Sequence, residues 1–295
     1  MYAGFYNLSV LPFENTPDPR FFFASEQHRE ALAAIEYAIR LRKGPVLVTG
    51  SIGSGKTTIG QAIIQRCRAS ANILQLVHGH DQPHELLGHL LRALGHHPDP
   101  SADHAELLET LKQQLINQAE TGRPVVIFID EAQTLTDAVL EELRLLSNFD
   151  TPDARLLQLV LIGQPELRQR IAGPHMAPLR QRIALAKQLH PLEREDTHRY
   201  IHHRLVTASI DPQNLGIDFD DDALDRIHNA SQGVPRLINA VCDNCLLLGY
   251  VNQTQTIDRP TVERVLHDMV PSFDTQTQPD IPHAPINPTE YRLAG

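Results

Sequence analysis

The stretch GSIGSGKTT, from Gly50 to Thr58, has the residue types and the spacing that hold polyphosphates. It matches the pattern G-x-x-x-x-G-K-[ST], with an apolar run before it and a helical pattern after it. Glycines let successive backbone N–H groups point at phosphate oxygens, at the positive end of the helix that begins near Lys56. The Lys56 ammonium then reaches the β- and γ-phosphates, and the Thr57 hydroxyl is a ligand for Mg²⁺. The predicted nucleotide-binding residues of this loop are Gly50, Ser51, Gly53, Ser54, Gly55, Lys56, Thr57 and Thr58.

A second segment, VVIFIDEAQ, ends an apolar strand pattern in Asp130 and Glu131. Paired carboxylates at the tip of a buried strand are costly as structure alone, and open parallel sheets bind ligands at that edge. We therefore predict that Asp130 holds Mg²⁺ through water and that Glu131 orients or deprotonates the attacking water. No Asn-Lys-x-Asp sequence that would read guanine is present, so the predicted substrate is ATP rather than GTP.

The patterns that must position these residues divide the chain into parts. Residues 45–190 alternate short apolar runs with helical patterns, which predicts a three-layer α/β domain with a parallel sheet. Expected strands cover 45–49, 72–77, 124–130 and 156–163. Residues 191–270 carry helical patterns alone and predict a small all-helical lid domain, so the whole follows the AAA+ plan of a P-loop domain with a lid. Residues 1–44 form an N-terminal segment, and the Pro-rich tail 271–295 is expected to be disordered.

Four polar residues sit where AAA+ proteins contact the triphosphate. Gln164 ends a strand, where it would sense the γ-phosphate or act as a turn or capping residue. Arg180 and Arg182 precede a short apolar strand, from which an arginine reaches the ATP of a neighbouring subunit. We favour Arg182 as this arginine, with Arg180 as the alternative. Either of them could instead be an ordinary surface residue. Arg236 begins a lid helix, where a cation is unfavourable without an anion nearby, and we expect it to fold onto the γ-phosphate.

The composition is that of a soluble globular protein, with 41% hydrophobic and 21% charged residues. A net charge of -10 argues against a surface that is wholly a nucleic-acid footprint. Three cysteines make no disulfide framework, which indicates a reducing compartment. No secretion signal is visible, and no apolar run approaches the roughly 20 residues that span a bilayer. We predict a cytoplasmic protein without an integral membrane segment, at most peripheral to the inner membrane.

Six segments together resemble one family. They are FYNLSVLPFENTPDPRFFFASEQHREALAAIEYAI, GSIGSGKTT, FIDEAQTL, LIGQPELRQRI, LRQRIALAKQLHPLEREDTHRYIHHRL and SQGVPRLINAVCDNCLL. The family is the ExeA-type ATPases, also called general secretion pathway protein A, and the resemblance covers roughly residues 1–268. It implies a homo-oligomeric ATPase with ATP and Mg²⁺ that serves type II secretion, mannose-sensitive pilus biogenesis or exopolysaccharide export. It also implies that the N-terminal segment packs near the nucleotide base, where we place Phe13, Pro17 and His28; core packing is the alternative for Phe13.

The chain departs from the longest members of this family, which continue into a transmembrane helix and a periplasmic peptidoglycan-binding domain. Its Pro-rich end resembles the shorter, soluble members, so we do not carry peptidoglycan binding over. A sister group of similar ATPases assists DNA transposition, and the basic runs RLRK (40–43) and QRCR (65–68) keep a DNA-associated regulator as the second hypothesis. The acidic overall charge favours protein partners in envelope machinery instead.

Two further clusters have simpler interpretations. Histidines crowd residues 78–97, at His78, His80, His84, His89, His96 and His97. Of these, His80 and His84 have helical spacing, but Pro83 interrupts it, so a solvated surface is favoured over a metal site. Cys242 and Cys245 form C-x-x-C inside a helical pattern without a second pair, which favours core thiols over zinc.

Overall fold

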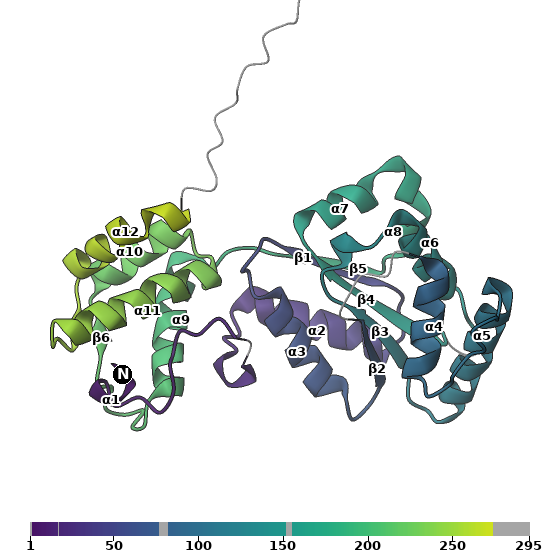
Figure 1. Ribbon diagram of the computed structural model, residues 1–295, viewed down its shortest axis with the longest axis horizontal. Coiled ribbons are helices and arrows are strands. Elements are labelled where there is room, and N and C mark those ends of the chain that lie inside the picture. The colour runs from purple at the N-terminus through teal and green to yellow at the C-terminus, as the bar shows by residue number, and fades with distance from the viewer. Residues whose placement is uncertain (1, 17, 77–81, 152–154, 274–295) are drawn as a thin grey trace, which may run out of the picture.

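The computed structural model describes residues 2–16, 18–76, 82–151 and 155–273 (Figure 1). Two lobes lie side by side, an α/β lobe and a helical lobe, with α2 and α3 near the junction (Figure 1). In the α/β lobe the helices are α2 (Glu26–Arg40), α3 (Lys56–Cys67), α4 (Pro83–Ala93), α5 (His104–Glu120), α6 (Asp137–Leu146), α7 (Pro165–Ala172) and α8 (Ala177–Arg182). The helical lobe contains α1 (Tyr2–Phe5), α9 (Arg194–Ala208), α10 (Asp221–Ser231), α11 (Pro235–Val251) and α12 (Arg259–Phe273).

Five parallel strands form the sheet of the α/β lobe, in the order β2-β3-β4-β1-β5. They are β1 (Val46–Gly50), β2 (Asn72–Leu76), β3 (Val125–Ile129), β4 (Leu157–Gly163) and β5 (Leu185–Leu189). Each of the expected strands lies within a residue or so of its predicted range, because fully buried parallel strands leave continuous apolar runs in the sequence. The predicted α/β P-loop fold with a helical part after it is confirmed.

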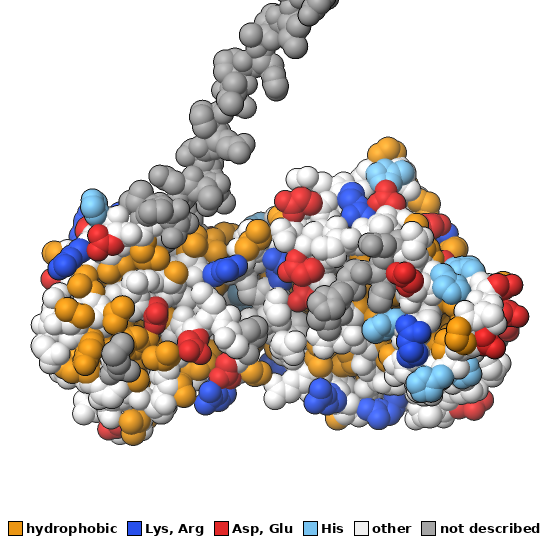
Figure 2. Space-filling model, in the orientation of Figure 1, with side chains coloured by type: hydrophobic (Ala, Val, Ile, Leu, Met, Phe, Trp, Pro, Cys, Tyr) orange, Lys and Arg blue, Asp and Glu red, His pale blue; other side chains and the backbone are white. Residues whose placement is uncertain are grey.

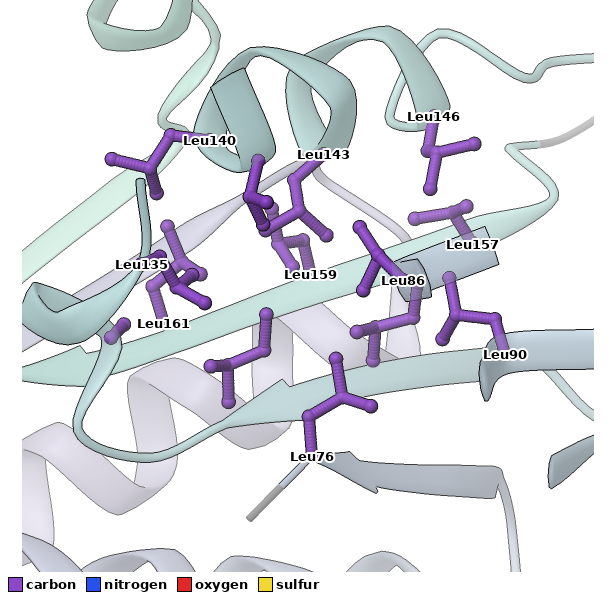
Figure 3. Packing of buried hydrophobic residues seen from close by; sticks show 14 of the residues in the cluster. Leu76, Leu86, Leu90, Leu135, Leu140, Leu143, Leu146, Leu157, Leu159 and Leu161 are labelled. Carbon is purple, nitrogen blue, oxygen red and sulfur yellow. The ribbon is translucent and has the colours of Figure 1, made fainter. Parts of the chain in front are cut away.

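In the strands β1 to β4, alternate residues pack into two different cores. In β4, Leu157, Leu159 and Leu161 face α4 and α6, where they meet leucines such as Leu86 and Leu143 (Figure 3). The intervening residues of β4 belong to the core on the opposite face, with α2 and α3. Each leucine that is fully buried in this way stabilises the fold by roughly 1.5–3 kcal/mol. The two cores hold the sheet rigid, so that the loops at its carboxyl edge have fixed positions.

The helical lobe has its own core, to which the start of the chain contributes. Tyr2, Tyr6, Leu8 and Phe13 are buried among residues of α9 to α12. Backbone pairing between Leu8 and Ser209 attaches this first segment to the end of α9. The later part of the N-terminal segment packs on the sheet instead, through Phe22 and the buried face of α2. The described residues of the N-terminal segment therefore contact both lobes.

Two short strands interrupt the all-helical pattern that we expected for the second domain. β6 (Asp218–Phe219) and β7 (Thr256–Ile257) form a parallel pair that ties the start of α10 to the start of α12. Two-residue strands carry no detectable periodicity, so the sequence did not reveal them.

Cys242 and Cys245 are free thiols, fully buried on the core side of α11, and burial raises the pKa of both. The expected tail falls outside the described residues from 274 onward, whereas 271–273 belong to α12.

None of the helices in the described ranges is both long and apolar enough to cross a membrane.

Candidate nucleotide-binding site

The phosphate loop connects β1 to α3 at the carboxyl edge of the sheet. Gly53 and Gly55 have backbone φ angles of +79° and +89°, which residues other than glycine rarely adopt. These angles turn the backbone into the first turn of α3, which begins at Lys56. Lys56 is 5% exposed, and its Nζ donates a hydrogen bond to the carbonyl oxygen of Ser51 at 2.8 Å. The ammonium thus lies inside the curve of the loop.

The loop fits a polyphosphate by its unused donors. The hydroxyl oxygens of Ser51 and Ser54 are buried without a hydrogen-bond partner among the described residues. Burial lowers the pKa of Lys56, while the nearby carboxylates of Glu131 and Asp130 oppose this shift. Unpaired buried donors and a desolvated cation are costly unless an anion accepts from them. This combination points to phosphate oxygens as the missing partners.

Thr57 and Asp130 bring together oxygen ligands of the kind that Mg²⁺ prefers. The Thr57 hydroxyl donates to Oδ2 of Asp130 at 3.0 Å, which joins the first turn of α3 to the end of β3. The backbone N–H of Glu131 donates to the other carboxylate oxygen of Asp130 at 2.8 Å. The carboxylate is thereby oriented toward the phosphate loop, so the residues present fit a magnesium ion beside the phosphates.

Glu131 stands in an unusual backbone conformation and is held by two glutamine amides. Its φ is +52°, a left-handed conformation that is uncommon outside glycine and asparagine and costs on the order of 1 kcal/mol. Gln133 Nε2 donates to Oε2 of Glu131 at 2.5 Å, and Gln164 Nε2 donates to the same oxygen at 3.2 Å. Gln133 also accepts from the backbone N–H of Gln164 at 3.0 Å. The ends of β3 and β4 are thus connected through side-chain amides around one carboxylate.

The first turn of α11 packs directly on the phosphate loop. A Cβ placed on Gly53 would lie 2.7 Å from Cβ of Arg236, so the loop and the helix are in contact at this point. The Arg236 side chain lines the same cleft as Lys56 and Glu131. Among the described residues it has neither a hydrogen bond nor an ion pair from its guanidinium, which leaves that group available to an anion in the cleft.

A cleft of about 500 Å³ between the lobes contains these groups. Figure 2 shows the groove at the junction of the lobes, with basic and acidic side chains along it. Its volume lies within the usual range for small-molecule sites. The phosphate loop, Glu131, Gln164 and Arg236 contribute to its lining together with residues of the N-terminal segment and the helical lobe. The lining residues from these other parts are Glu14, Asn15, Thr16, Asp18, Phe21, Phe22, Phe23, Leu192, Tyr200, Arg204, Pro235 and Asn239.

The three residues that the family resemblance placed near the base have different positions. His28 lines the cleft and lies against the loop, since a Cβ on Gly55 would be 3.2 Å from its Nε2. Its Nδ1 lies 2.5 Å from Ser25 Oγ, and burial lowers its pKa. Phe13 is 2% exposed within the core of the helical lobe and is not among the lining residues. Pro17 lies outside the described residues.

The two candidate arginine fingers lie away from this cleft. Arg180 donates to the carbonyl oxygen of Ala172, whereas Arg182 is exposed and has no partner among the described residues. Arg182 precedes β5, and the far end of that strand, Leu189, pairs with Gly50 beside the phosphate loop. The five residues of β5 alone span roughly 13 Å. Arg182 therefore lies at the opposite edge of the sheet from the nucleotide site of its own chain.

Several lining residues were absent from the sequence-based prediction. Gln133, which bonds Glu131 but does not itself line the cleft, was also missed, although it stands two residues after Glu131. Asn15, Tyr200, Arg204 and Asn239 were missed because they come from three separate segments. The i, i+4 spacing of Tyr200 and Arg204 in α9 was the one local signal that pointed to a shared face. His78 and His80 of the histidine cluster fall outside the described residues. Among the described residues, no three His, Cys, Asp or Glu side chains lie together in a group that could hold a metal ion.

The fold and the arrangement of the site are those of the AAA+ class of P-loop proteins. A family model described as an AAA domain matches residues 39–171. Cdc6p from Pyrobaculum aerophilum shares the fold with a TM-score of 0.65 and 15% identity, over 87% of this chain and 70% of that one. The Aeropyrum pernix ORC2 protein, solved as ADPNP–ADP complexes, has a TM-score of 0.59 and 16% identity, over 89% of this chain and 72% of that one. At such identities the likeness shows the fold.

Among the relatives of the chain is General secretion pathway protein A of Aeromonas hydrophila, which is 36% identical over 258 residues. The match covers 87% of this chain and 46% of that protein. The predicted resemblance to the ExeA-type ATPases is confirmed. The chain spans about half the length of the curated relatives that it matches.

Proposed function

We propose that the chain binds and hydrolyses Mg-ATP in a homo-oligomer and drives or regulates an envelope-assembly system. The observation that carries the ATPase part is the convergence of Lys56, Thr57, Glu131 and Arg236 on one cleft, with Asp130 bonded to Thr57 beside it. These residues come from both lobes, so nucleotide binding connects the lobes. Phosphoryl transfer depends mainly on positioning and on stabilising charge, which is what such a cleft supplies.

Each residue has a distinct part in the proposed reaction. The phosphate-loop N–H groups and Lys56 hold the β- and γ-phosphates, and Thr57 and Asp130 hold Mg²⁺. The ion, when bound, would neutralise charge that develops on the phosphate oxygens. Glu131 accepts the proton of the attacking water or orients it, and Gln164 fixes its carboxylate. In this proposal Gln164 holds the catalytic base Glu131 in position. It also lines the cleft, where it would contact the γ-phosphate.

Arg182 is proposed to complete the site of a neighbouring subunit. It is exposed, it lacks a partner among the described residues, and it lies across the sheet from its own phosphate loop. Arg180 is already engaged by the carbonyl of Ala172, which favours Arg182 over it. A guanidinium that reaches the neighbour's γ-phosphate would make hydrolysis depend on the oligomer.

The biological setting follows from the relative rather than from the site. The name of that relative, General secretion pathway protein A, supports a partner in type II secretion, with pilus biogenesis and exopolysaccharide export as related settings. We propose a location on the cytoplasmic side, peripheral to the inner membrane, with protein partners there. Phosphate release from ATP, measured against protein concentration with and without Mg²⁺, tests the ATPase. No release at any concentration would contradict it.

One structural feature favours the second candidate, a DNA-associated ATPase. Basic residues stand just before four neighbouring strands of the sheet: Lys43 before β1, Arg68 before β2, Arg123 before β3 and Arg155 before β4. None has a carboxylate partner among the described residues. The basic runs that kept this hypothesis open thus lie along one edge of the molecule. Binding to duplex DNA with a steep salt dependence in the presence of ATP would favour this candidate, and its absence at low salt would favour the first.

A further inference from the structure

A chain of hydrogen bonds joins lining residues that the helical lobe and the N-terminal segment contribute to the cleft. Arg204 Nη1 donates to the Tyr200 hydroxyl at 2.9 Å, and this hydroxyl donates to Oδ1 of Asn239 at 2.8 Å. Nδ2 of Asn239 then donates to Oδ1 of Asn15 at 3.1 Å. The four residues come from α9, α11 and the N-terminal segment, and all of them line the cleft.

The direction of this chain is fixed by its first member. Arginine has donors and no acceptor, so the Tyr200 oxygen must accept from Arg204. The hydroxyl has one hydrogen, which it gives to Asn239, so the carbonyl side of that amide faces Tyr200. The NH2 side of Asn239 therefore faces Asn15 and occupies the Asn15 oxygen. The Asn15 amide is left with its NH2 group as the free end.

The anchor at Arg204 is rigid. Its side chain is 7% exposed, its Nη2 donates to the carbonyl of Glu14 at 3.0 Å, and its Nε donates to the carbonyl of Pro12. The guanidinium carbon also lies 4.7 Å from the ring centroid of Phe21. Arg204 thus holds the backbone on both sides of Phe13 while it orients Tyr200. Asn15, in contrast, is exposed to the cleft and free to meet a ligand.

A triphosphate held by the phosphate loop places its nucleoside in the remaining part of the same cleft. That part contains Phe22 and Phe23, whose rings suit an aromatic base, together with Asn15. A donor at this point matches the ring nitrogen N1 of adenine, which accepts a hydrogen bond. It opposes N1 of guanine, which carries a hydrogen.

We propose that Asn15 reads the base, with its NH2 group donating to N1 of adenine, and that Asn239, Tyr200 and Arg204 are positioning residues that fix the orientation of this amide. This inference rests on the proposed function, because it requires a nucleotide in the cleft. It also connects the two ends of the ligand through one helix. Asn239 lies three residues after Arg236 in α11, so base and phosphate contacts involve the same face of that helix.

The test is competition of ATP and of GTP, with Mg²⁺, against a fluorescent ADP analogue on the full chain. The wild-type chain should bind ATP at least about tenfold more tightly than GTP, because ATP gains one hydrogen bond from Asn15 whereas GTP presents a second donor to it. Asn15→Asp leaves an acceptor facing N1, so the ratio of ATP to GTP affinity should fall by about tenfold or more. Asn239→Asp cannot donate to Asn15, whose amide must turn over and present its oxygen. The ratio should then fall in the same way without a new charge at position 15.

Asn244→Asp is the matched control, since Asn244 is exposed on α11 and its Nδ2 bonds the carbonyl of Ala240 outside the cleft. It should leave the ratio unchanged. Equal weakening of both nucleotides by Asn15→Asp, an unchanged ratio, or a wild-type preference for GTP would each overturn the inference. Asn239 is buried, so if its variant does not fold, the exposed Asn15 variant alone decides. A wild-type chain that binds neither nucleotide overturns the proposed function together with the inference.

Discussion

Gln164 Nε2 donates a hydrogen bond to Oε2 of Glu131 at 3.2 Å, across the ends of two adjacent strands. Gln133 donates to the same oxygen. An amide can hold a carboxylate in position without placing a second charge beside it. The arrangement agrees with the role of Glu131 as the group that activates water.

Replacing the carboxylate by an amide tests this role directly. Glu131→Gln keeps the size of the side chain but cannot take a proton, so we expect turnover to fall by about 10²–10⁴-fold. Mg-ATP affinity, measured by displacement of a fluorescent nucleotide, should change little. Glu120→Gln, at the exposed end of α5, is the charge-matched control and should behave as wild type. Turnover within a few fold of wild type in Glu131→Gln would remove this residue from the mechanism.

The proposed contribution of Arg182 to a neighbour predicts complementation between inactive chains. Arg182→Ala should lower turnover by about 10³–10⁵-fold without loss of nucleotide binding, because its own cleft is intact. Lys56→Ala should lose binding. In a mixture of the two variants, a Lys56→Ala chain offers Arg182 to an Arg182→Ala chain, so phosphate release should partly recover.

Arg180→Ala is the comparison, since Arg180 bonds the carbonyl of Ala172. It should retain turnover and cost some stability instead. If Arg180→Ala is the inactive variant that Lys56→Ala rescues, the assignment moves to Arg180. If no mixture recovers activity, the trans contribution itself is wrong.

The contact between the phosphate loop and α11 predicts that Gly53 tolerates no side chain. In Gly53→Ala the new methyl group would lie 2.7 Å from Cβ of Arg236, so α11 must move away from the loop. We expect turnover to fall on the order of 100-fold from this displacement. Gly95→Ala is the matched control, because Gly95 has a similar φ of +83° and nothing within 4 Å of the added Cβ. Equal effects of the two substitutions on turnover would show that backbone strain, not the contact, matters.

The buried His28 predicts a loss of stability in acid. Its pKa is lowered by burial from the ordinary value of 6.5, so below that pH the unfolded chain binds more protons than the folded one. The stability that neutral His28 contributes is present above pH 6.5 and is lost as the pH falls toward the folded pKa. Urea unfolding from about pH 7.5 to about 5.5 should show this decline, and His28→Gln should flatten it. Burial also lowers the pKa of His203 and His228, so part of the slope should remain.

His97→Gln, an exposed histidine away from the cleft, serves as the control for this series. It should keep the wild-type slope. If the dependence of stability on pH is unchanged in His28→Gln, the half-buried His203 and His228 account for the whole effect.

Local patterns in the sequence were sufficient for the phosphate end of the site. The loop around Gly53 and Gly55 needs positive φ angles, and glycine at those places is visible in one short stretch. The strand that ends in Asp130 is continuous and apolar, so its carboxyl tip was also predictable. The structure places Thr57 beside Asp130 as this reasoning requires, although their roles in catalysis stay predictions.

The positions of the residues that the resemblance assigned to the nucleotide base could not be deduced from the sequence. Phe13, Pro17 and His28 were proposed there by resemblance, yet Phe13 packs in the helical core and His28 lies against the phosphate loop. An aromatic residue in an apolar context suits a core and a base pocket equally well. Its place is decided by which helices pack around it.

The sequence by itself determined the class of this protein, because a phosphate loop, buried parallel strands and amphipathic helices are each specified by neighbouring residues. Tertiary structure alone decided which distant polar groups meet. Asn15 and Asn239 are 224 residues apart and are joined by a hydrogen bond between their amides. Arg180 bonds the carbonyl of Ala172, whereas Arg182 has no partner among the described residues. Such pairings depend on how two independently formed cores fit together, and no periodicity within either segment encodes that fit.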